Sequence, residues 1–191
     1  MNFDVPSDLP TRLPVLPLRQ GFLLPGVAAP FGVGRPASIK ALDASEGWVL
    51  VAMQREPTEE IDPSSLLPIA VLARILHPIQ RPDGNRAVVV QGVARVRLGA
   101  MVQTEPHLEA EFERVTETWP ETIEAQATQR ALVEAVEKIV QQMNIEAPVQ
   151  VLARNVEDPS VLVDLVAAFI ESDLAFKHDV VCETDPMTRA R

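Results

Sequence analysis

The chain has 191 residues, of which 47% are hydrophobic and 23% charged, and its formal net charge is −10. This length and composition fit a single folding unit with two lobes and a buried core. The negative charge and the lack of a basic run argue against a nucleic-acid partner, because phosphates require clustered Lys and Arg.

The single cysteine and the N-terminal residues bear on the cellular compartment. Cys182 has no partner for an internal disulfide, and a lone thiol suits a reducing compartment. Residues 1–10 lack the basic and apolar regions of a secretory signal, and no segment approaches the roughly 20 apolar residues of a membrane helix. We therefore expect a cytoplasmic protein that contacts no membrane.

The N-terminal part of the chain has the pattern of strands and stiff turns. Residues 1–12 are polar and contain prolines, which predicts a flexible tail before a β-rich lobe over residues 13–118. The apolar segment 13–18 contains two prolines without backbone donors, so we expect it at a sheet edge or barrel rim. Pro36 suits the first turn of a short helix, and the apolar segment 48–53 predicts a strand buried on both faces.

Further strands are predicted over residues 69–76, 87–90 and 93–98. The Asp83-Gly84 pair between the first two is typical of a hairpin turn. Arg95 and Arg97 alternate with apolar residues, so we expect both to face solvent. Residues 108–115 repeat the alternation with glutamates and predict another half-exposed strand.

After Pro120 the apolar period changes from two residues to 3.6, which predicts a helical lobe over residues 119–191. A long helix beginning near Glu121 would bury one stripe, formed by Leu132, Val136, Ile139, Val140 and Met143. Asp158 and Asp173 are predicted to cap later helices. The helix after Asp158 would bury Leu162, Leu165, Val166 and Phe169. The fold class is therefore α+β, with a β-rich lobe followed by a helical bundle.

Motifs for catalysis, metal binding or nucleotide binding are not recognisable. The Gly32-Val-Gly34 segment continues with Arg-Pro instead of the Gly-Lys-Ser/Thr of a P-loop. His77, His107 and His178 are isolated and lack the spacing of metal ligands. No G-x-S-x-G elbow is present. We expect no catalytic residue and no metal ligand in this chain.

One segment rich in proline and glycine contains several large apolar side chains. Pro25-Gly26 in this segment matches the central pair of a type II turn, and such segments usually lie at the surface. These side chains either close the end of the barrel or form an open patch that binds apolar segments of other polypeptides. The candidate binding residues are Phe22, Leu23, Leu24, Pro25, Pro30 and Phe31.

Several short motifs follow one another over most of the chain. In the first half they are residues 13–19, 24–26, 30–31 and 33–35. Residues 51–52, 73–75, 82–84 and 90–96 follow, and residues 158–160 with Leu162, Asp164 and Ala167 come last. In order and spacing they resemble the N-terminal domain of Lon-type ATP-dependent proteases, from about Leu13 to Pro186.

The resemblance implies a β-rich, PUA-like pseudo-barrel followed by helices. It also implies a non-catalytic role in which the domain binds unfolded or damaged proteins and passes them to the AAA+ module and the serine peptidase of the same polypeptide. Those modules are not among these residues, so no cofactor is expected here, and ATP and Mg²⁺ would belong to the AAA+ module. In full-length members the resemblance implies a homo-hexamer, with weak self-association of the isolated domain.

Three alternatives remain open at this stage. The first is a free-standing adaptor or scaffold of the same fold without protease activity. The second is RNA binding by the barrel through Arg95 and Arg97, although the acidic total and the 4% aromatic content argue against it. The third, a small hydrolase, requires a nucleophile that the sequence does not reveal.

Overall fold

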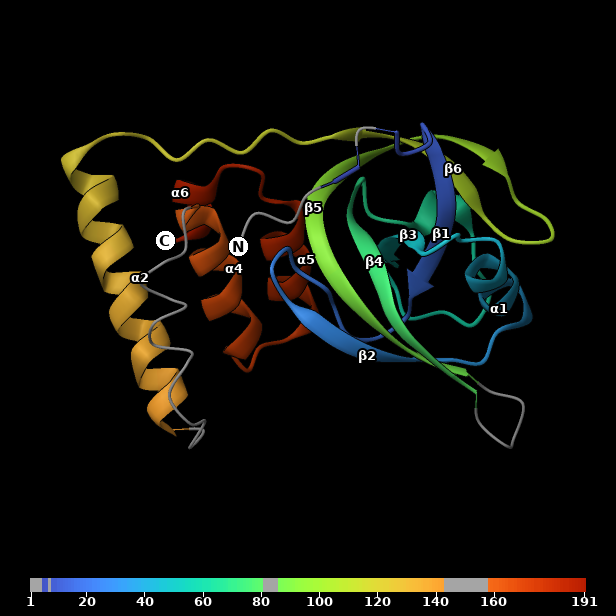
Figure 1. The fold of residues 1–191 in the computed structure, drawn as a ribbon, viewed down its shortest axis with the longest axis horizontal. Helices are drawn as coiled ribbons and strands as arrows, with labels where there is room; N and C mark the ends of the chain where they lie inside the picture. Colours follow the sequence, from blue (N-terminus) through green and yellow to red (C-terminus); the bar gives the residue numbers. More distant parts are fainter. Residues whose placement is uncertain (1–4, 7, 81–85, 143–157) are drawn as a thin grey trace.

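The computed structural model describes residues 5–6, 8–80, 86–142 and 158–191. It has a strand-rich lobe and a helical lobe side by side (Figure 1). The strands are β1 Arg12–Leu18, β2 Ala28–Val33, β3 Trp48–Met53, β4 Ile69–Gln80, β5 Arg86–Gln103 and β6 Glu109–Arg114. The helices are α1 Pro36–Asp43, α2 Ile123–Gln142, α4 Pro159–Phe169, α5 Leu174–Cys182 and α6 Pro186–Arg189.

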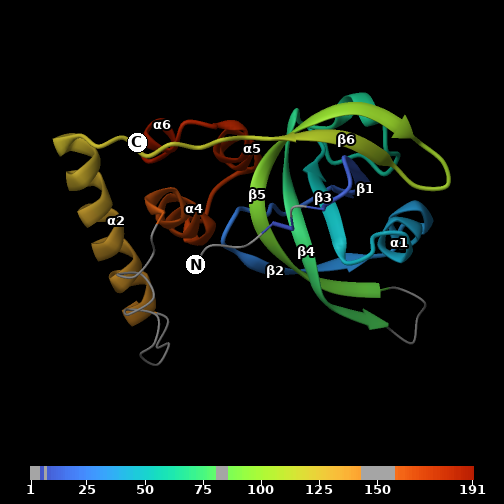
Figure 2. The same cartoon turned by 45° about the horizontal axis from the view of Figure 1, so that its top comes forward.

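The six strands form one sheet in the order β2-β5-β4-β3-β1-β6, and β5 also pairs with β6. This additional pairing closes five of the strands into a barrel (Figure 2). Closure depends on the length of β5, whose first part pairs with β2 and whose last part pairs with β6. Among the strand pairs of the described residues, only β1 and β3 run parallel.

The predicted edge position of β1 is wrong, because β1 lies between β3 and β6. Each neighbour pairs with only part of the strand: β6 with Arg12–Pro14 and β3 with Val15–Leu18. Val15 N donates to Leu108 O at 2.8 Å, and Leu18 O accepts from Gln54 N at 3.0 Å. Two prolines are tolerated in this strand because neither β3 nor β6 forms backbone hydrogen bonds along its whole length.

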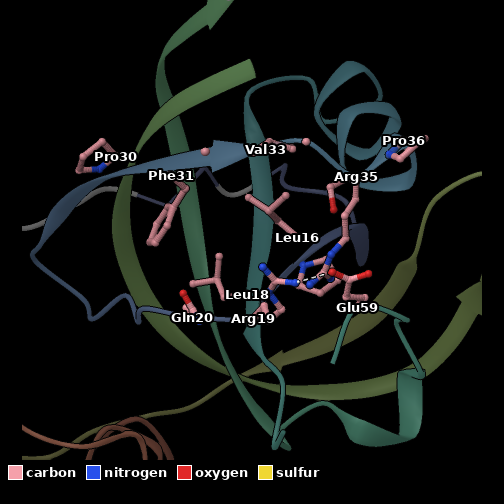
Figure 3. Close-up of a pocket in the computed structure, with 14 residues that line it drawn as sticks. Leu16, Leu18, Arg19, Gln20, Pro30, Phe31, Val33, Arg35, Pro36 and Glu59 are labelled. Atoms are coloured by element: carbon pink, nitrogen blue, oxygen red, sulfur yellow. Dashed lines mark hydrogen bonds and ion pairs between the residues drawn. The ribbon is translucent and has the colours of Figure 1, made fainter. Parts of the chain in front are cut away.

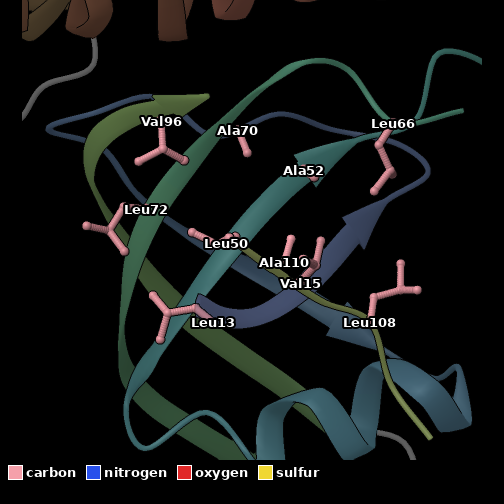
Figure 4. Packing of buried hydrophobic residues seen from close by; sticks show 10 residues of the cluster. All are labelled: Leu13, Val15, Leu50, Ala52, Leu66, Ala70, Leu72, Val96, Leu108 and Ala110. Carbon is pink, nitrogen blue, oxygen red and sulfur yellow. The ribbon is translucent and has the colours of Figure 1, made fainter. Parts of the chain in front are cut away.

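Strand β3 passes through the core, as its continuous apolar sequence predicted. Leu50 and Ala52 pack in one buried cluster with residues of β1, β4 and β6 (Figure 4). Val49 and Val51 point to the opposite face and pack in a second cluster, against which α1 is placed. Alternate side chains of a strand lie on opposite faces, so burial of both sets confirms that β3 is covered on both sides.

The hairpin predicted around Asp83 and Gly84 falls on residues outside those described. The strands on either side pair antiparallel from Gln80 and Arg86 onward. The two predicted strands 87–90 and 93–98 form one continuous strand, β5. Gln91 and Gly92, which lie between them, pair with Arg74 and Ala73 of β4, and the register shifts between Gly92 and Ala94.

The predicted helix caps are confirmed. The Asp158 side chain accepts a hydrogen bond from Ser160 N, and that of Asp173 accepts one from Phe176 N. In the α2 stripe, Leu132 and Val136 are buried and Ile139 is half-buried. The side chains of Val140 and Met143 lie outside the described part.

The buried face predicted for α4 is partly wrong, because Phe169 is 46% exposed. Helix α4 lies between α2 and the barrel, so two sides of it are covered (Figure 1). Leu162 and Val163 pack with α2, whereas Ala167 belongs to a cluster that includes barrel residues. A helix packed on two sides buries a wider face than the single stripe predicted from a period of 3.6.

Candidate functional site

Half of the predicted binding residues are part of the core. Leu23 and Leu24 are 2% and 1% exposed, and Pro25 is also buried. The predicted turn is present, since Gly26 has φ 81° and Val27 N donates to Leu24 O at 3.2 Å. Of the two alternatives for this segment, the open patch is wrong for these three residues, because their side chains are buried.

The turn is docked against β5, which explains the burial of Leu23 and Leu24. Gly26 N donates to Gly92 O at 3.0 Å, and Gly92 N donates to Val27 O at 2.9 Å. A Cβ at position 92 would lie 2.2 Å from Leu24 O. Glycine is therefore required for this close approach of two backbones.

The other three predicted residues keep some exposure but do not share one patch. Phe22 is half-buried on the side of the helical lobe, with Lys177 Nζ 5.3 Å from its ring centroid. Pro30 is exposed and Phe31 half-buried, and both line a pocket of the barrel. Their role in binding stays a prediction.

Exposed apolar side chains also occur at the turn between α4 and α5. Phe169, Ile170 and Phe176 are 46%, 45% and 39% exposed. Phe22 lies against the same helix α5, because Lys177 contacts its ring. We call these four residues the junction surface, because they lie where the helical lobe meets the barrel.

The barrel pocket lies between the end of β1, strand β2 and the first turn of α1. Its volume is about 620 Å³. Phe31 points toward Leu18 on one side, whereas Arg19, Arg35 and Glu59 come together on the other (Figure 3). The pocket thus combines an apolar wall with a charged end.

Buried charges connect the two lobes. Arg95 of β5 was expected in solvent, but its side chain is fully buried. Its Nη1 and Nη2 lie 2.6 and 2.8 Å from the two carboxylate oxygens of Asp164 in α4. It also donates to Val180 O at 2.9 Å and to Val181 O at 3.1 Å, both in α5. The helical lobe covers this face of β5, which is why the alternating pattern misled the prediction.

Arg189 and Glu117 complete this group of charges. Arg189 Nη1 is 2.6 Å from Glu117 Oε1, which also lies 3.3 Å from Arg95 Nη1. Arg189 Nε lies 3.0 Å from Asp164 Oδ1, without the alignment of a hydrogen bond. Burial raises the pKa of Glu117 more than the charges of Arg95 and Arg189 lower it. We call Arg95, Glu117, Asp164 and Arg189 the lobe-joining network.

The signal for this network was available in the sequence. Asp164 lies in the middle of the apolar helix Pro159–Phe169. A carboxylate on the buried side of a helix requires a cationic partner. With Arg95 buried, the two-arginine strip required for RNA binding is not formed.

The described residues contain no group of three or more His, Cys, Asp and Glu side chains that could hold a metal ion. Burial raises the pKa of the Cys182 thiol, which disfavours the reactive thiolate. Among the helices of the described ranges, none is long and apolar enough to cross a membrane.

Comparisons with known proteins agree with this architecture. The family model of the ATP-dependent protease La (LON) substrate-binding domain matches residues 12–191. Lon protease of Flavobacterium johnsoniae is 34% identical over 171 residues, which is 85% of this chain and 21% of that protein. Lon protease 2 of Thermus thermophilus is 32% identical over 188 residues, which is 96% of this chain and 23% of that protein.

Solved structures give the same result. The N-terminal domain of Mycobacterium avium complex Lon protease superposes with a TM-score of 0.73 at 25% identity, covering 94% of both chains. A Lon N-terminal domain protein from Xanthomonas campestris shares the fold, with a TM-score of 0.66 at 16% identity and 94% coverage of both chains. The chain spans between about a fifth and a quarter of the length of the curated relatives. It belongs to the family of the ATP-dependent protease La (LON) substrate-binding domain, whose model matches it over residues 12–191.

Proposed function

We propose that this domain binds unfolded or damaged polypeptides and helps deliver them to the AAA+ and peptidase modules of a Lon-type protease. The family match over residues 12–191 supports a substrate-binding role. In this proposal the domain acts in protein quality control in the cytoplasm. ATP and Mg²⁺ are used by the AAA+ module and not by this domain.

The exposed apolar residues of the junction surface carry the proposal. Phe169, Ile170 and Phe176 lie within one short segment and remain between 39% and 46% exposed. Unfolded polypeptides expose apolar side chains that folded proteins bury, and contiguous apolar surface on a folded protein is typical of binding sites. The junction surface is therefore the expected contact for such clients.

Binding by one domain is expected to be weak. A receptor for many unfolded sequences uses modest apolar contacts, because it cannot be complementary to a single shape. Several copies on one oligomer gain affinity through effective concentration. We accordingly expect the full-length protein to be a homo-hexamer. The isolated domain should self-associate only weakly.

A titration tests the proposal. A destabilised, apolar-rich protein is titrated against the monomeric domain and against the same domain fused to a hexameric scaffold. We expect tighter binding to the hexameric form, and equal affinities of the two forms would contradict the multivalent part of the proposal.

Crosslinking then identifies the surface. Phe169→Ser and Phe176→Ser should reduce crosslinks to the unfolded protein while the melting temperature changes little, because both side chains are already partly in solvent. Val102→Ser is the matched control, since Val102 is 42% exposed on β5 and lies outside the junction surface. If all three variants crosslink like the wild type, the junction surface is not the contact.

A further inference from the structure

The charged end of the barrel pocket holds more positive than negative charge. Arg19 Nη1 lies 3.3 Å from Glu59 Oε1, and the Glu59 side chain is 91% exposed. Arg35 has no carboxylate within ion-pair distance among the residues that the structure describes. One exposed carboxylate thus faces two guanidinium groups.

The guanidinium group of Arg35 is only partly satisfied. Its Nη2 donates to Gln54 Oε1 at 3.0 Å and to Thr58 O at 3.4 Å. Its Nη1 is buried and has no hydrogen-bond partner in the described part of the chain. A buried donor without an acceptor costs free energy, and the positive charge of this incompletely paired guanidinium group favours an anion in the pocket.

The local electrostatics make this arrangement unfavourable without an anion. Arg35 occupies the N-cap position of α1, where a cation opposes the helix dipole, and the first turn of α1 contains no acidic residue. Burial and the nearby charge of Arg19 lower the pKa of Arg35 more than the charge of Glu59 raises it. In a molecule of net charge −10, this pocket is a local region of positive charge.

The remaining walls favour a peptide side chain over an added β-strand. Phe31 and Leu18 give an apolar wall beside the arginines (Figure 3). Pro17 of β1 and Pro30 of β2, which also line the pocket, have no backbone N–H to donate to an incoming strand. A ligand is therefore held through an apolar group and an anionic group.

We propose that the pocket formed by Arg19, Arg35 and Phe31 binds a carboxylate of the substrate polypeptide together with a neighbouring apolar side chain. This inference rests on the proposed function and adds a chemical preference to it. The carboxylate comes from an Asp or Glu side chain or from the C-terminus, and both present the same group to the two arginines.

Three fluorescent peptides of the same apolar sequence distinguish these sources. The first contains one internal Glu and an amidated C-terminus, the second has Gln instead and a free C-terminus, and the third has Gln and an amidated C-terminus. We expect at least one of the first two to bind about five-fold more tightly than the third at low salt, as one partly exposed ion pair allows. Equal affinity of all three peptides would overturn the inference.

Single substitutions locate the effect. Arg19→Gln should reduce the affinity of the preferred peptide to that of the third, neutral peptide. Glu59→Gln should increase the affinity of the preferred peptide, because a competing carboxylate is removed. Both side chains are exposed enough for the fold to be retained. Arg12→Gln is the matched control, because Arg12 is exposed, pairs with Glu109 and lies outside this pocket.

The pattern of outcomes separates this inference from the proposed function. If Arg12→Gln and Arg19→Gln weaken binding equally, the effect is one of total charge and the pocket is not the site. If the apolar-rich protein binds but the peptides show no carboxylate preference, only the inference fails. If neither the protein nor any peptide binds, the proposed function fails as well.

Discussion

Arg95 and Asp164 form a buried, two-point ion pair although they lie 69 residues apart in the sequence. Arg95 belongs to the barrel and Asp164 to the helical lobe, so this pair fixes one lobe against the other. Arg95 also donates to two carbonyl groups of α5, and these contacts leave none of its three nitrogens without a partner. The two lobes are therefore expected to unfold together.

Asp164→Ala should lower the free energy of unfolding by about 3 kcal/mol, because it leaves Arg95 buried without its main counter-ion. Denaturant titration measures the change. Asp43→Ala is the control, since it removes a carboxylate that pairs with Arg86 at the surface, where an ion pair contributes less than about 1 kcal/mol. Equal effects of the two substitutions would show that the buried pair does not stabilise the junction between the lobes.

Glu117 should make the stability depend on pH. Its folded pKa is raised above the ordinary value of 4.5 by burial, so its contribution to stability is complete below that value and is lost as the pH rises through the folded pKa. Glu117→Gln removes this titration. The free energy of unfolding of the wild type minus that of the variant should therefore fall as the pH rises.

The comparison isolates Glu117 because groups common to both proteins cancel. Hydrogen bonds lower the pKa values of Asp62 and Asp185, which therefore lose stabilisation as the pH falls and act in the opposite direction. Urea titrations at a series of pH values provide the measurement. A wild-type-minus-variant difference that is constant, or that rises with pH, would contradict the raised pKa.

Local features of this fold could be predicted from a few consecutive residues. Pro36 at the start of α1, the caps at Asp158 and Asp173, and the turn at Pro25-Gly26 depend on backbone geometry within one turn. Burial of Arg95 depends instead on a helix far along the chain. Alternation along a strand shows only that its two faces differ, and another lobe can cover the polar face.

The candidate site was predictable to a smaller extent for the same reason. A segment rich in proline and glycine correctly predicted a turn at Leu24, but the sequence does not show that this turn docks on Gly92. The exposure of Phe169 was also missed, because a helical period predicts a buried stripe without showing where the covering elements end. The charged pocket depends on Arg19 and Arg35, which no local motif connects.

Gly92→Ala should destabilise the protein by about 2–4 kcal/mol, since the added methyl group would overlap Leu24 O and separate the turn from β5. Gly32→Ala is the matched control on β2, where an added Cβ meets nothing within 4 Å. Thermal unfolding of both variants gives the comparison. If Gly92→Ala is as stable as Gly32→Ala, the close approach at Gly92 is not required for the docking of the turn.

Cys182 should react slowly with alkylating reagents in the folded protein. Its thiol is half-buried, and burial raises its pKa, so less thiolate is present at neutral pH than for a free cysteine. We expect iodoacetamide to modify the folded chain several-fold more slowly than the same chain in denaturant, as followed by intact mass. The ratio should narrow as the pH rises toward the thiol pKa, because the thiolate fraction then increases in the folded protein. Equal rates for the folded and unfolded chains would show that the thiol is neither shielded nor shifted, and Cys182 would then have to be considered as a reactive residue.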